Sequence, residues 1–306
     1  MKKIVILGSS GFIGNSFISK INKKKFKIFS PTSRDLDLLK YNSIKKYFKS
    51  LPKIDLIINC AAKIGGLGYM INYPDKIFLE NYQIIGNLLK ITKELDIQNY
   101  LAIGSACSYP DQLNIMKEEN FWNGRINPNI EPYGFIKKFE LVGLQALNLK
   151  NRNFNYYYPI LANVYGPGDS FDLYNSHVLG SLIRKFIEAK RKSFKKVNVW
   201  GDGSSVRDFI YIEDVSNILN KIIFKKKYRN KIINITSGEN IAIKKLVEKI
   251  QTEINFKGTV YWDKTKPNGV KFKALSNKNM TKMKLNTVYN LNRGIKKTID
   301  WYEKFR

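Results

Sequence analysis

Tyr133 and Lys137 stand four residues apart, the spacing that places two side chains on the same face of a helix. A free phenol has a pKa of about 10, so proton exchange near neutral pH is easier when a cation lowers that value. Lys137 can supply this cation. Ser105, just after a predicted strand, can donate a hydrogen bond to a substrate carbonyl. Together the three residues predict an acid–base site that acts on a carbonyl group.

Cys107 and His177 are a second pair of candidate catalytic residues. Cys107 lies two residues after Ser105, in a loop beyond a predicted strand, and His177 is the single histidine of the chain. A thiolate and an imidazolium on opposite sides of a carbonyl-bearing sugar can remove and return the proton next to the carbonyl. A cysteine is more often a small buried apolar side chain, which is our interpretation of Cys60. For Cys107 both interpretations stay open.

A glycine-rich segment, Gly8-Ser-Ser-Gly11-Phe-Ile-Gly14, follows a short apolar run and opens an amphipathic segment. Glycines at this spacing allow a tight turn and a close approach of the backbone to a phosphate, and the helix N-terminus then holds a pyrophosphate. The pattern alone is weak, but its place between a predicted strand and a predicted helix indicates a dinucleotide site.

Ser33 and Arg34 follow the second predicted strand, and the first acidic residue there is Asp35. A site for NAD places an acid at this point to accept from the ribose 2′-hydroxyl, whereas an arginine suits a 2′-phosphate. The sequence therefore predicts NADP, with Lys137 holding the nicotinamide ribose.

The N-terminal half alternates short apolar runs with helical periodicity, which predicts an α/β fold with a doubly wound parallel sheet of Rossmann type. The expected strands are Lys3–Leu7, Phe26–Ser30, Leu56–Ala61, Tyr100–Ile103 and Tyr156–Leu161. The expected helices of this half are a segment ending near Ile21, Tyr41–Leu51, Lys76–Leu95 and Tyr133–Leu149.

The regular alternation of predicted strands and helices ends after Gly166. The elements expected there are the helix Val178–Lys190, the strand Lys196–Trp200, the helix Val215–Ile223 and a final helix Arg293–Lys304. We expect residues 1–165 with about 207–233 to form the dinucleotide-binding domain. Residues 166–206 with about 234–306 are expected to form a smaller, mixed α/β substrate domain, with the active-site cleft between the two.

The composition is that of a soluble globular protein, with 306 residues of which 43% are hydrophobic and 25% charged. Two cysteines are too few for a disulfide framework and no apolar run reaches the ~18 residues of a membrane span, so we expect a cytoplasmic protein. The net charge is +28, from 53 basic and 25 acidic residues. The basic residues are spread in short runs over several elements. This favours a biased composition and attraction of anionic ligands over a nucleic-acid surface.

The motifs resemble those of the GDP-L-fucose synthases, which are short-chain dehydrogenases/reductases of the extended type. The resemblance runs in order from Gly8 to about Leu275. Besides the glycine-rich segment, the matching segments are Ala61–Gly66, Gly104–Pro110, Tyr133 with Lys137, Ala162–Asp169, Asn175–Val178, Val199–Gly201, Arg207–Phe209 and Thr265–Gly269.

That family uses NADPH to convert GDP-4-keto-6-deoxy-D-mannose into GDP-L-fucose, epimerising C3 and C5 before it reduces C4. The resemblance implies that Ser105, Tyr133 and Lys137 form the reductive triad. It also implies that Cys107 and His177 are the base and the acid of epimerisation.

Binding residues follow from the same resemblance. Together with the spacing arguments above, it gives the full set of residues expected to bind the cofactor: Gly8, Ser10, Gly11, Phe12, Ile13, Gly14, Ser33, Arg34, Ala61, Ala62, Lys137 and Asn163. The residues implied to bind the GDP-linked sugar are Asn163, Lys185, Trp200, Arg207 and Lys273. The resemblance further implies a homodimer that pairs the helices Lys76–Leu95 and Tyr133–Leu149, and we expect no metal ligand.

The chain departs from the family pattern around the sugar and the diphosphate. Lys185 stands where the family usually has an arginine, and Phe272 replaces a basic residue. Leu161-Ala162 replaces a Pro-Thr pair, and the loop Leu67–Ile71 is bulkier than the family's polar version. A second hypothesis is therefore a C4 reductase of a GDP-4-keto-heptose, or of another 4-keto sugar, without epimerisation. Its product would serve capsule or lipopolysaccharide synthesis.

A third hypothesis is a regulator that senses the cofactor and binds nucleic acid through its basic surface. The intact set of Ser105, Tyr133 and Lys137 argues against it, because a sensor needs no proton donor. The family's dehydratase relatives carry Thr-Asp-Glu where this chain has Ser105-Ala106-Cys107, which also argues against a 4,6-dehydratase.

Overall fold

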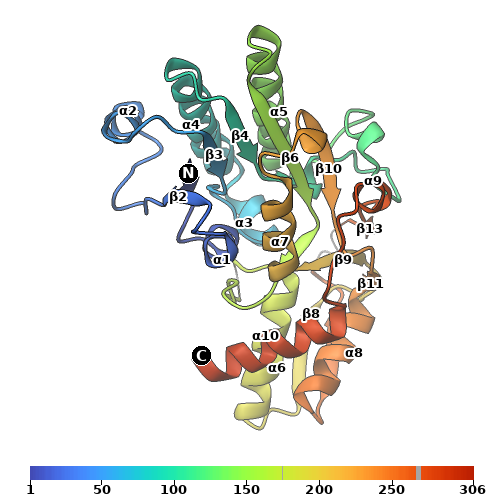
Figure 1. Ribbon diagram of the computed structural model, residues 1–306. Helices are drawn as coiled ribbons and strands as arrows, with labels where there is room; N and C mark the ends of the chain where they lie inside the picture. Colours follow the sequence, from blue (N-terminus) through green and yellow to red (C-terminus); the bar gives the residue numbers. More distant parts are fainter. Residues whose placement is uncertain (174, 267–269) are drawn as a thin grey trace.

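The computed structural model describes residues 1–173, 175–266 and 270–306. Figure 1 shows two lobes, a larger one built on a parallel sheet and a smaller one around the helices α6, α8 and α10. The smaller lobe includes the C-terminus.

The larger lobe is built on a parallel sheet with the strand order β10-β6-β4-β3-β1-β2, in which β5 also pairs with β6. Its strands are β1 (Lys2–Leu7), β2 (Phe26–Phe29), β3 (Leu56–Asn59), β4 (Asn99–Ala102), β5 (Gly104–Ser105), β6 (Asn155–Leu161) and β10 (Lys231–Ile235). The order reverses beside β1, as in a doubly wound dinucleotide-binding sheet. The predicted fold class is therefore confirmed.

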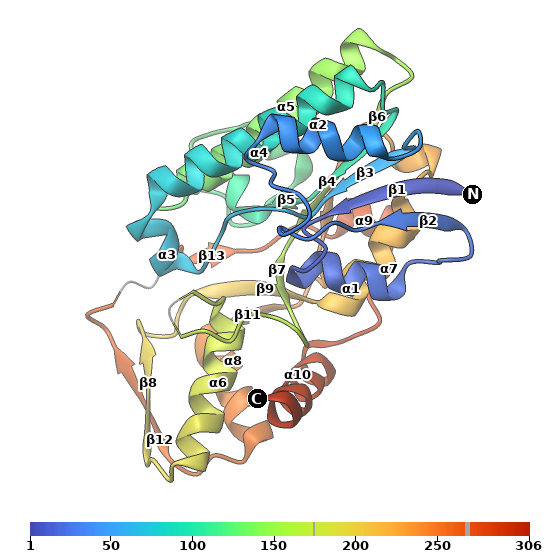
Figure 2. The ribbon, with the colours of Figure 1, turned by 90° about the vertical axis from the view of Figure 1, so that its left-hand side faces the viewer.

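Helices cover both faces of this sheet, which explains why its strands are apolar on both sides. Figure 2 shows α2, α4 and α5 on one face and α1 and α7 on the other. Their bounds are α1 (Phe12–Lys20), α2 (Tyr41–Ser50), α4 (Pro74–Glu94), α5 (Glu131–Lys150) and α7 (Ile212–Ile222). The central strands β1 and β3 bury Ile4, Ile6, Leu56 and Ile58 completely.

The smaller lobe holds a mixed sheet and a parallel pair of strands. The mixed sheet consists of β7 (Asn163–Tyr165), β9 (Val206–Tyr211), β11 (Asn240–Ala242) and β13 (Phe272–Lys273), and the pair of β8 (Lys196–Trp200) and β12 (Thr259–Asp263). Its helices are α6 (Val178–Arg191), α8 (Ile243–Ile254) and α10 (Leu291–Phe305). They enclose a second apolar cluster that includes Phe186, Leu246 and Ile299. Within the described residues, no helix is both long and apolar enough to cross a membrane.

Several element boundaries differ from those expected. β3 ends at Asn59 instead of Ala61, because the Asn59 side chain accepts the Ala61 N–H at 3.1 Å and turns the chain. α4 begins at Pro74, a residue suited to the first turn of a helix. α7 begins at Ile212, three residues early, and Glu213 and Asp214 favour that N-terminus.

The prediction of a loop at Leu67–Ile71 is wrong, because these residues form the short helix α3 (Leu67–Asn72). The Gly66 N–H donates to the Asn175 carbonyl at 2.8 Å, which fixes the start of this helix against the segment before α6. A tertiary contact of this kind is not readable from helical periodicity.

Two segments near or beyond the boundary expected at Asn234 lie on the larger lobe. β10 extends the parallel sheet to Ile235, slightly past the boundary expected near Asn234. Leu275, Met280 and Leu285, around the short helix α9 (Lys278–Lys282), pack into the first core. The segment 275–285 thus lies on the larger lobe, although it was expected in the substrate domain.

Asp208 ties the mixed sheet to the parallel sheet. The Thr236 hydroxyl, just after β10, donates to its carboxyl, and the Leu275 N–H does so at 3.2 Å. Asn163 on β7 donates to the Asp208 backbone carbonyl at 2.7 Å. Asp208 is 1% exposed, and this burial raises its pKa to about 7.

Glu140 ties α5 to the parallel sheet. Its carboxylate accepts from Lys137 Nζ at 3.1 Å, Asn59 Nδ2 at 2.7 Å and the Tyr100 hydroxyl at 3.4 Å. The Lys137 and Glu140 side chains are 4% and 0% exposed. In addition, the Tyr158 hydroxyl of β6 donates to the Lys137 carbonyl at 2.6 Å. The first turns of α5 are therefore held by β3, β4 and β6 together.

Replacing Asp208 should change how stability depends on pH. An unfolded aspartate has a pKa of about 3.9, so between about pH 4 and 7 the folded state binds more protons than the unfolded state. The stability contributed by Asp208 therefore falls as the pH rises through this window. The free energy of unfolding of Asp208→Asn, relative to that of the wild type, should therefore increase from pH 5 to 7.5. The increase should be at most about 1.4 kcal/mol per pH unit. Parallel urea-denaturation profiles at the two pH values would contradict this.

Replacing Glu140 should destabilise the fold strongly. Glu140→Gln leaves the Lys137 ammonium buried without its counter-charge, which we expect to cost about 3–5 kcal/mol in free energy of unfolding. Glu248→Gln is the matched control, since Lys245 and Glu248 form a pair at the same i,i+3 spacing but are 68% and 46% exposed. It should cost at most about 1 kcal/mol in the same urea denaturation. Equal losses for both variants would refute the role of the buried pair.

Candidate active site

The candidate residues of the larger lobe follow the carboxyl ends of its parallel strands, the edge where open α/β sheets bind ligands. The glycine-rich loop follows β1, Ala61 and Ala62 follow β3, and Ser105 ends β5. Cys107 lies in the short 3₁₀ helix η1 (Ala106–Ser108), which packs against α5.

The glycine-rich loop fits a pyrophosphate. Gly8 has φ +71°, and a Cβ there would lie 2.7 Å from the Ala61 nitrogen. A Cβ on Gly14 would collide with the Gly8 carbonyl oxygen, so both positions require glycine. α1 starts at Phe12 with Gly11 as its N-cap, without a side-chain cap and with no acid in its first turn. Its first N–H groups are therefore directed at the place where an anion would bind.

In the turn predicted to bind the 2′-phosphate, the Asp35 carboxylate already accepts hydrogen bonds from within the turn. The Thr32 N–H and hydroxyl donate to Asp35 at 2.8 and 2.7 Å, and these hydrogen bonds lower the pKa of Asp35. Ser33 and Arg34 are exposed beside this turn. Ser9 links the turn to the glycine-rich loop by donating to the Pro31 carbonyl at 2.8 Å. The arrangement offers a cation and a hydroxyl to a phosphate, and it withdraws the carboxylate that would accept from a ribose hydroxyl.

Tyr133 and Lys137 lie on one face at the start of α5, with Lys137 Nζ 6.0 Å from the centre of the Tyr133 ring. Burial raises the pKa of Tyr133, and the nearby Lys137 charge opposes this rise. The expectation of a lowered phenol pKa is therefore wrong in direction, because burial outweighs the cation. Lys137 itself has a raised pKa: burial favours the neutral amine, but the Glu140 carboxylate outweighs it and keeps the ammonium charged.

Ser105 is oriented by its neighbour. Its hydroxyl oxygen accepts the Cys107 N–H at 3.1 Å, and its one hydroxyl hydrogen can donate either to the Cys107 sulfur or to a substrate oxygen.

Positively charged side chains lie near Cys107. Lys273 Nζ, on β13, donates to Cys107 Sγ at 3.0 Å. Burial opposes ionisation of this thiol, but the charges of Lys273 and Arg207 and the hydrogen bond with Ser105 bring its pKa below the ordinary value. Cys60, also a free thiol, shows the opposite behaviour, since burial raises its pKa to about 12.

His177 is the N-cap of α6 and is exposed. Desolvation of the ring by its surroundings, together with the charge of Lys273, lowers the pKa of His177, so the imidazole is neutral near pH 7. Arg207, on β9, donates from Nη1 to the carbonyls of Val206 and Val270 at 2.8 and 2.6 Å. Asn163 lies on the neighbouring strand β7, where its amide is hydrogen-bonded to β9.

Trp200 and Lys185 form a second cluster in the smaller lobe. Lys185 Nζ on α6 donates to the Asn198 carbonyl at 3.0 Å and lies 6.0 Å from the Trp200 ring centre. Lys266 Nζ, which was not among the expected binding residues, lies 5.8 Å from the same ring. Trp200 is 48% exposed, so its indole can stack on a planar group with cations beside it. Pro267, Asn268 and Gly269 of the expected motif lie outside the described residues.

The sequence reasoning missed Glu140, which orients Lys137. Its signal was present, because a charged residue three positions after Lys137 falls on the same inward face of a predicted helix. It also missed the contact between Lys273 and Cys107, for which spacing carries no signal. Over the described ranges, no group of three or more His, Cys, Asp or Glu side chains gathers as metal ligands.

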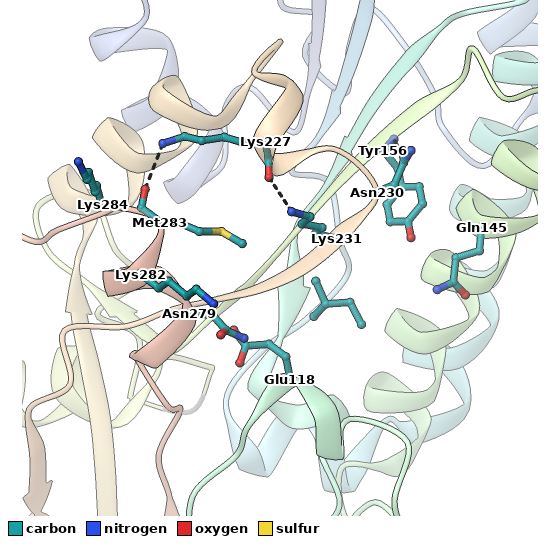
Figure 3. Close-up of a pocket in the computed structure, with 11 residues that line it drawn as sticks. Glu118, Gln145, Tyr156, Lys227, Asn230, Lys231, Asn279, Lys282, Met283 and Lys284 are labelled. Carbon is teal, nitrogen blue, oxygen red and sulfur yellow. Dashed lines mark hydrogen bonds between the residues drawn. The ribbon is translucent and has the colours of Figure 1, made fainter.

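A hollow of about 710 Å³ lies apart from these residues. Figure 3 shows lysines around it, among them Lys227 and Lys231, which donate to the Met283 and Lys227 carbonyls. Tyr156 and Lys231 line it from the first residues of β6 and β10. The hollow therefore opens at the amino ends of the parallel strands, whereas the catalytic candidates follow the carboxyl ends.

Comparisons with known proteins agree with this geometry. The profile of the NAD dependent epimerase/dehydratase family matches residues 4–236. The chain is 31% identical to GDP-L-colitose synthase of Yersinia pseudotuberculosis, over 98% of this chain and 97% of that protein. It is 30% identical to GDP-L-fucose synthase 1 of Arabidopsis thaliana, over 99% and 93% of the two chains.

Solved structures show the same fold. A GDP-6-OMe-4-keto-L-xylo-heptose reductase from C. jejuni superimposes with a TM-score of 0.88 at 22% identity, covering 100% of this chain and 98% of that one. A GDP-L-fucose synthetase from Naegleria fowleri gives a TM-score of 0.88 at 22% identity, covering 99% and 94%. The chain therefore belongs to the NAD dependent epimerase/dehydratase family, among the relatives of the GDP-L-fucose synthases.

Proposed function

We propose that the protein is an NADPH-dependent enzyme that reduces the C4 ketone of a GDP-linked 4-keto sugar and epimerises C3 and C5 beforehand. The observation that carries the proposal is that Ser105, Tyr133 and Lys137 lie near Cys107, whose sulfur accepts a hydrogen bond from Lys273, at the carboxyl end of the parallel sheet. Relatives named GDP-L-fucose synthase and GDP-L-colitose synthase support the GDP-linked substrate.

Each residue of the reductive set has a distinct task. NADPH, when bound, supplies the hydride. The Ser105 hydroxyl donates a hydrogen bond to the C4 oxygen, and Tyr133 donates its proton to the alkoxide that forms there. Burial keeps the Tyr133 phenol protonated beforehand, as a proton donor requires. Lys137, held charged by Glu140, then stabilises the phenolate that remains.

Epimerisation needs a base and an acid on opposite faces of the sugar. The Cys107 thiolate takes the proton from a carbon next to the carbonyl, and the electron pair moves onto the carbonyl oxygen. His177 then returns a proton from the other face. Because its pKa is lowered, His177 first has to gain that proton from solvent.

The second candidate function is C4 reduction of a GDP-4-keto-heptose, or of another 4-keto sugar, without epimerisation. The specific observation in its favour is α3, a bulky segment whose N-cap Gly66 is hydrogen-bonded to Asn175, two residues before His177. A change there alters the space around the proposed acid and leaves the reductive residues as they are.

Two broader features accompany the proposal. We assign dinucleotide binding to the larger lobe, which carries the glycine-rich loop, Ser33 and Arg34, and sugar binding to the smaller lobe, which carries Trp200; relative to the expected bounds, residues 275–285 belong with the larger lobe. A cytoplasmic location suits a mechanism that needs Cys107 as a free thiol, because cytoplasmic thiols stay reduced.

The decisive experiment incubates the protein with NADPH and GDP-4-keto-6-deoxy-D-mannose in D₂O, following the nicotinamide absorbance and the product mass together. Consumption of NADPH with deuterium at C3 and C5 is the expected result. Consumption without deuterium would select the plain C4 reductase. No consumption would contradict the substrate, and the same assay with GDP-4-keto-heptoses would follow.

Tyr133→Phe should lower the reduction rate by about 10²–10⁴-fold, because the proton donor is removed while the ring remains. Binding of NADPH, measured by its fluorescence, should be unchanged within about twofold, which controls for folding. Turnover within about tenfold of the wild type would exclude Tyr133 as the donor.

We also propose that α4 and α5 pair with the same helices of a second copy. Phe135, Val142 and Leu149 recur every seven residues along α5 and are 53%, 49% and 65% exposed. On α4, Leu79 and Tyr82 are 60% and 49% exposed. Phe78 stacks on Phe135, and the ring of Tyr82 meets that of Phe139 at a tilt of 41°, so the two helices form one apolar face. A stripe of this size supports burial in a dimer.

Val142→Glu should convert a dimer into a monomer, because it places a charge in the centre of the proposed interface. The matched control is Val288→Glu, at a valine that is 68% exposed outside α4 and α5. Light scattering after gel filtration measures both masses. A monomeric wild type, or a dimer that survives Val142→Glu, would contradict the proposal.

A further inference from the structure

We propose that Lys273 is a positioning residue that holds Cys107 as a thiolate, in addition to the phosphate contact that the family resemblance implies. The proposal rests on the proposed function only for what the thiolate does to the substrate. The pairing of the two side chains is a property of the protein without substrate.

The contact joins distant parts of the chain. Lys273 lies on β13, where it is in register with Arg207 of the parallel neighbour β9. Its ammonium is 3.0 Å from Cys107 Sγ, across 166 residues of sequence. Cys107 and Lys273 are both partly buried, so the charge of Lys273 is weakly screened where it meets the sulfur.

The other groups that face Cys107 favour the same charge state. The Ser105 side chain on β5 favours the ionised thiol through a hydrogen bond, and Arg207 on β9 adds a second positive charge. Tyr133 on α5 interacts with the thiol and is itself neutral, since its pKa is raised. Burial works against the thiolate, yet the cations outweigh it and the pKa of Cys107 falls. Cationic neighbours of this kind are how proteins lower the pKa of reactive cysteines.

Lys273 also acts on the proposed acid. Its charge contributes to the lowered pKa of His177, so one ammonium favours the thiolate on one side and the neutral imidazole on the other. A residue that served only to bind a diphosphate would have no need of a hydrogen bond to the sulfur. The contact therefore gives Lys273 a positioning role that can be tested without a diphosphate.

Alkylation of the thiol tests the inference without any sugar. Iodoacetamide reacts with the thiolate, forming a sulfur–carbon bond and releasing iodide, so its rate follows ionisation of the cysteine. The rate at Cys107 is measured from pH 5 to 10 by mass spectrometry of the digested protein. The peptide with Cys60 serves as an internal reference, since burial raises the pKa of that thiol to about 12.

We expect Lys273→Met to move the midpoint of the Cys107 profile to higher pH and to slow alkylation at pH 7 by about three- to tenfold. Lys273→Arg should restore most of the wild-type profile. The matched control is Lys271→Met, which removes the same charge two residues earlier, at an exposed lysine. This control should leave the midpoint unchanged. Equal shifts for Lys271→Met and Lys273→Met, or no shift for either, would overturn the inference.

Deuterium exchange separates this result from failure of the proposed function. With the sugar nucleotide, Lys273→Met should move the pH profile of kcat for exchange in the same direction as the alkylation profile. A rise in KM alone, with both profiles unchanged, would reduce Lys273 to a binding residue. If the wild type exchanged no deuterium, epimerisation would be refuted, while the alkylation profiles would still decide the role of Lys273.

Discussion

The buried carboxylate of Glu140 is the constraint on which the geometry of the site depends. An unpaired charge at this depth would cost several kcal/mol, so its partners have to be in place whenever the protein is folded. Those partners are Lys137 one turn earlier on α5, Asn59 at the end of β3 and Tyr100 on β4. Together they fix the depth and rotation of α5 against the sheet. Tyr133 is thereby held beside the carboxyl ends of the strands.

The surroundings of Tyr133 and Cys107 shift the pKa values of these two side chains in opposite directions. Tyr133 is kept protonated because burial outweighs the charge of Lys137. Cys107, near Tyr133, ionises more easily because Lys273 and Arg207 outweigh its burial. Separated pKa values of this kind assign the acid and the base in many enzymes. Here the thiol has the charges of Lys273 and Arg207 and hydrogen bonds from Ser105 and Lys273 in its favour, whereas the phenol has only the charge of Lys137 against its burial and the charges of Cys107 and Glu140.

Much of this site could be predicted from the spacing of nearby residues. The remaining features depend on contacts between residues far apart in the sequence. The glycine-rich loop and the face shared by Tyr133 and Lys137 were predictable because turn geometry and helical period act within a few residues. The direction of the Tyr133 pKa was not, since burial is a property of the assembled fold. α3 was missed for the same reason, because its start depends on a hydrogen bond between Gly66 and Asn175.

The thiolate depends on the packing of the two lobes, because its cations come from the mixed sheet. Lys273 and Arg207 lie in register on β13 and β9. Asp208, the residue after Arg207, anchors β9 to Thr236 and Leu275 of the larger lobe. A slip of β9 by one residue would turn Arg207 to the opposite face and leave Asp208 without these donors. The buried carboxyl therefore holds the register that brings Lys273 to Cys107, and the chemistry of the thiol is coupled to the junction between the sheets.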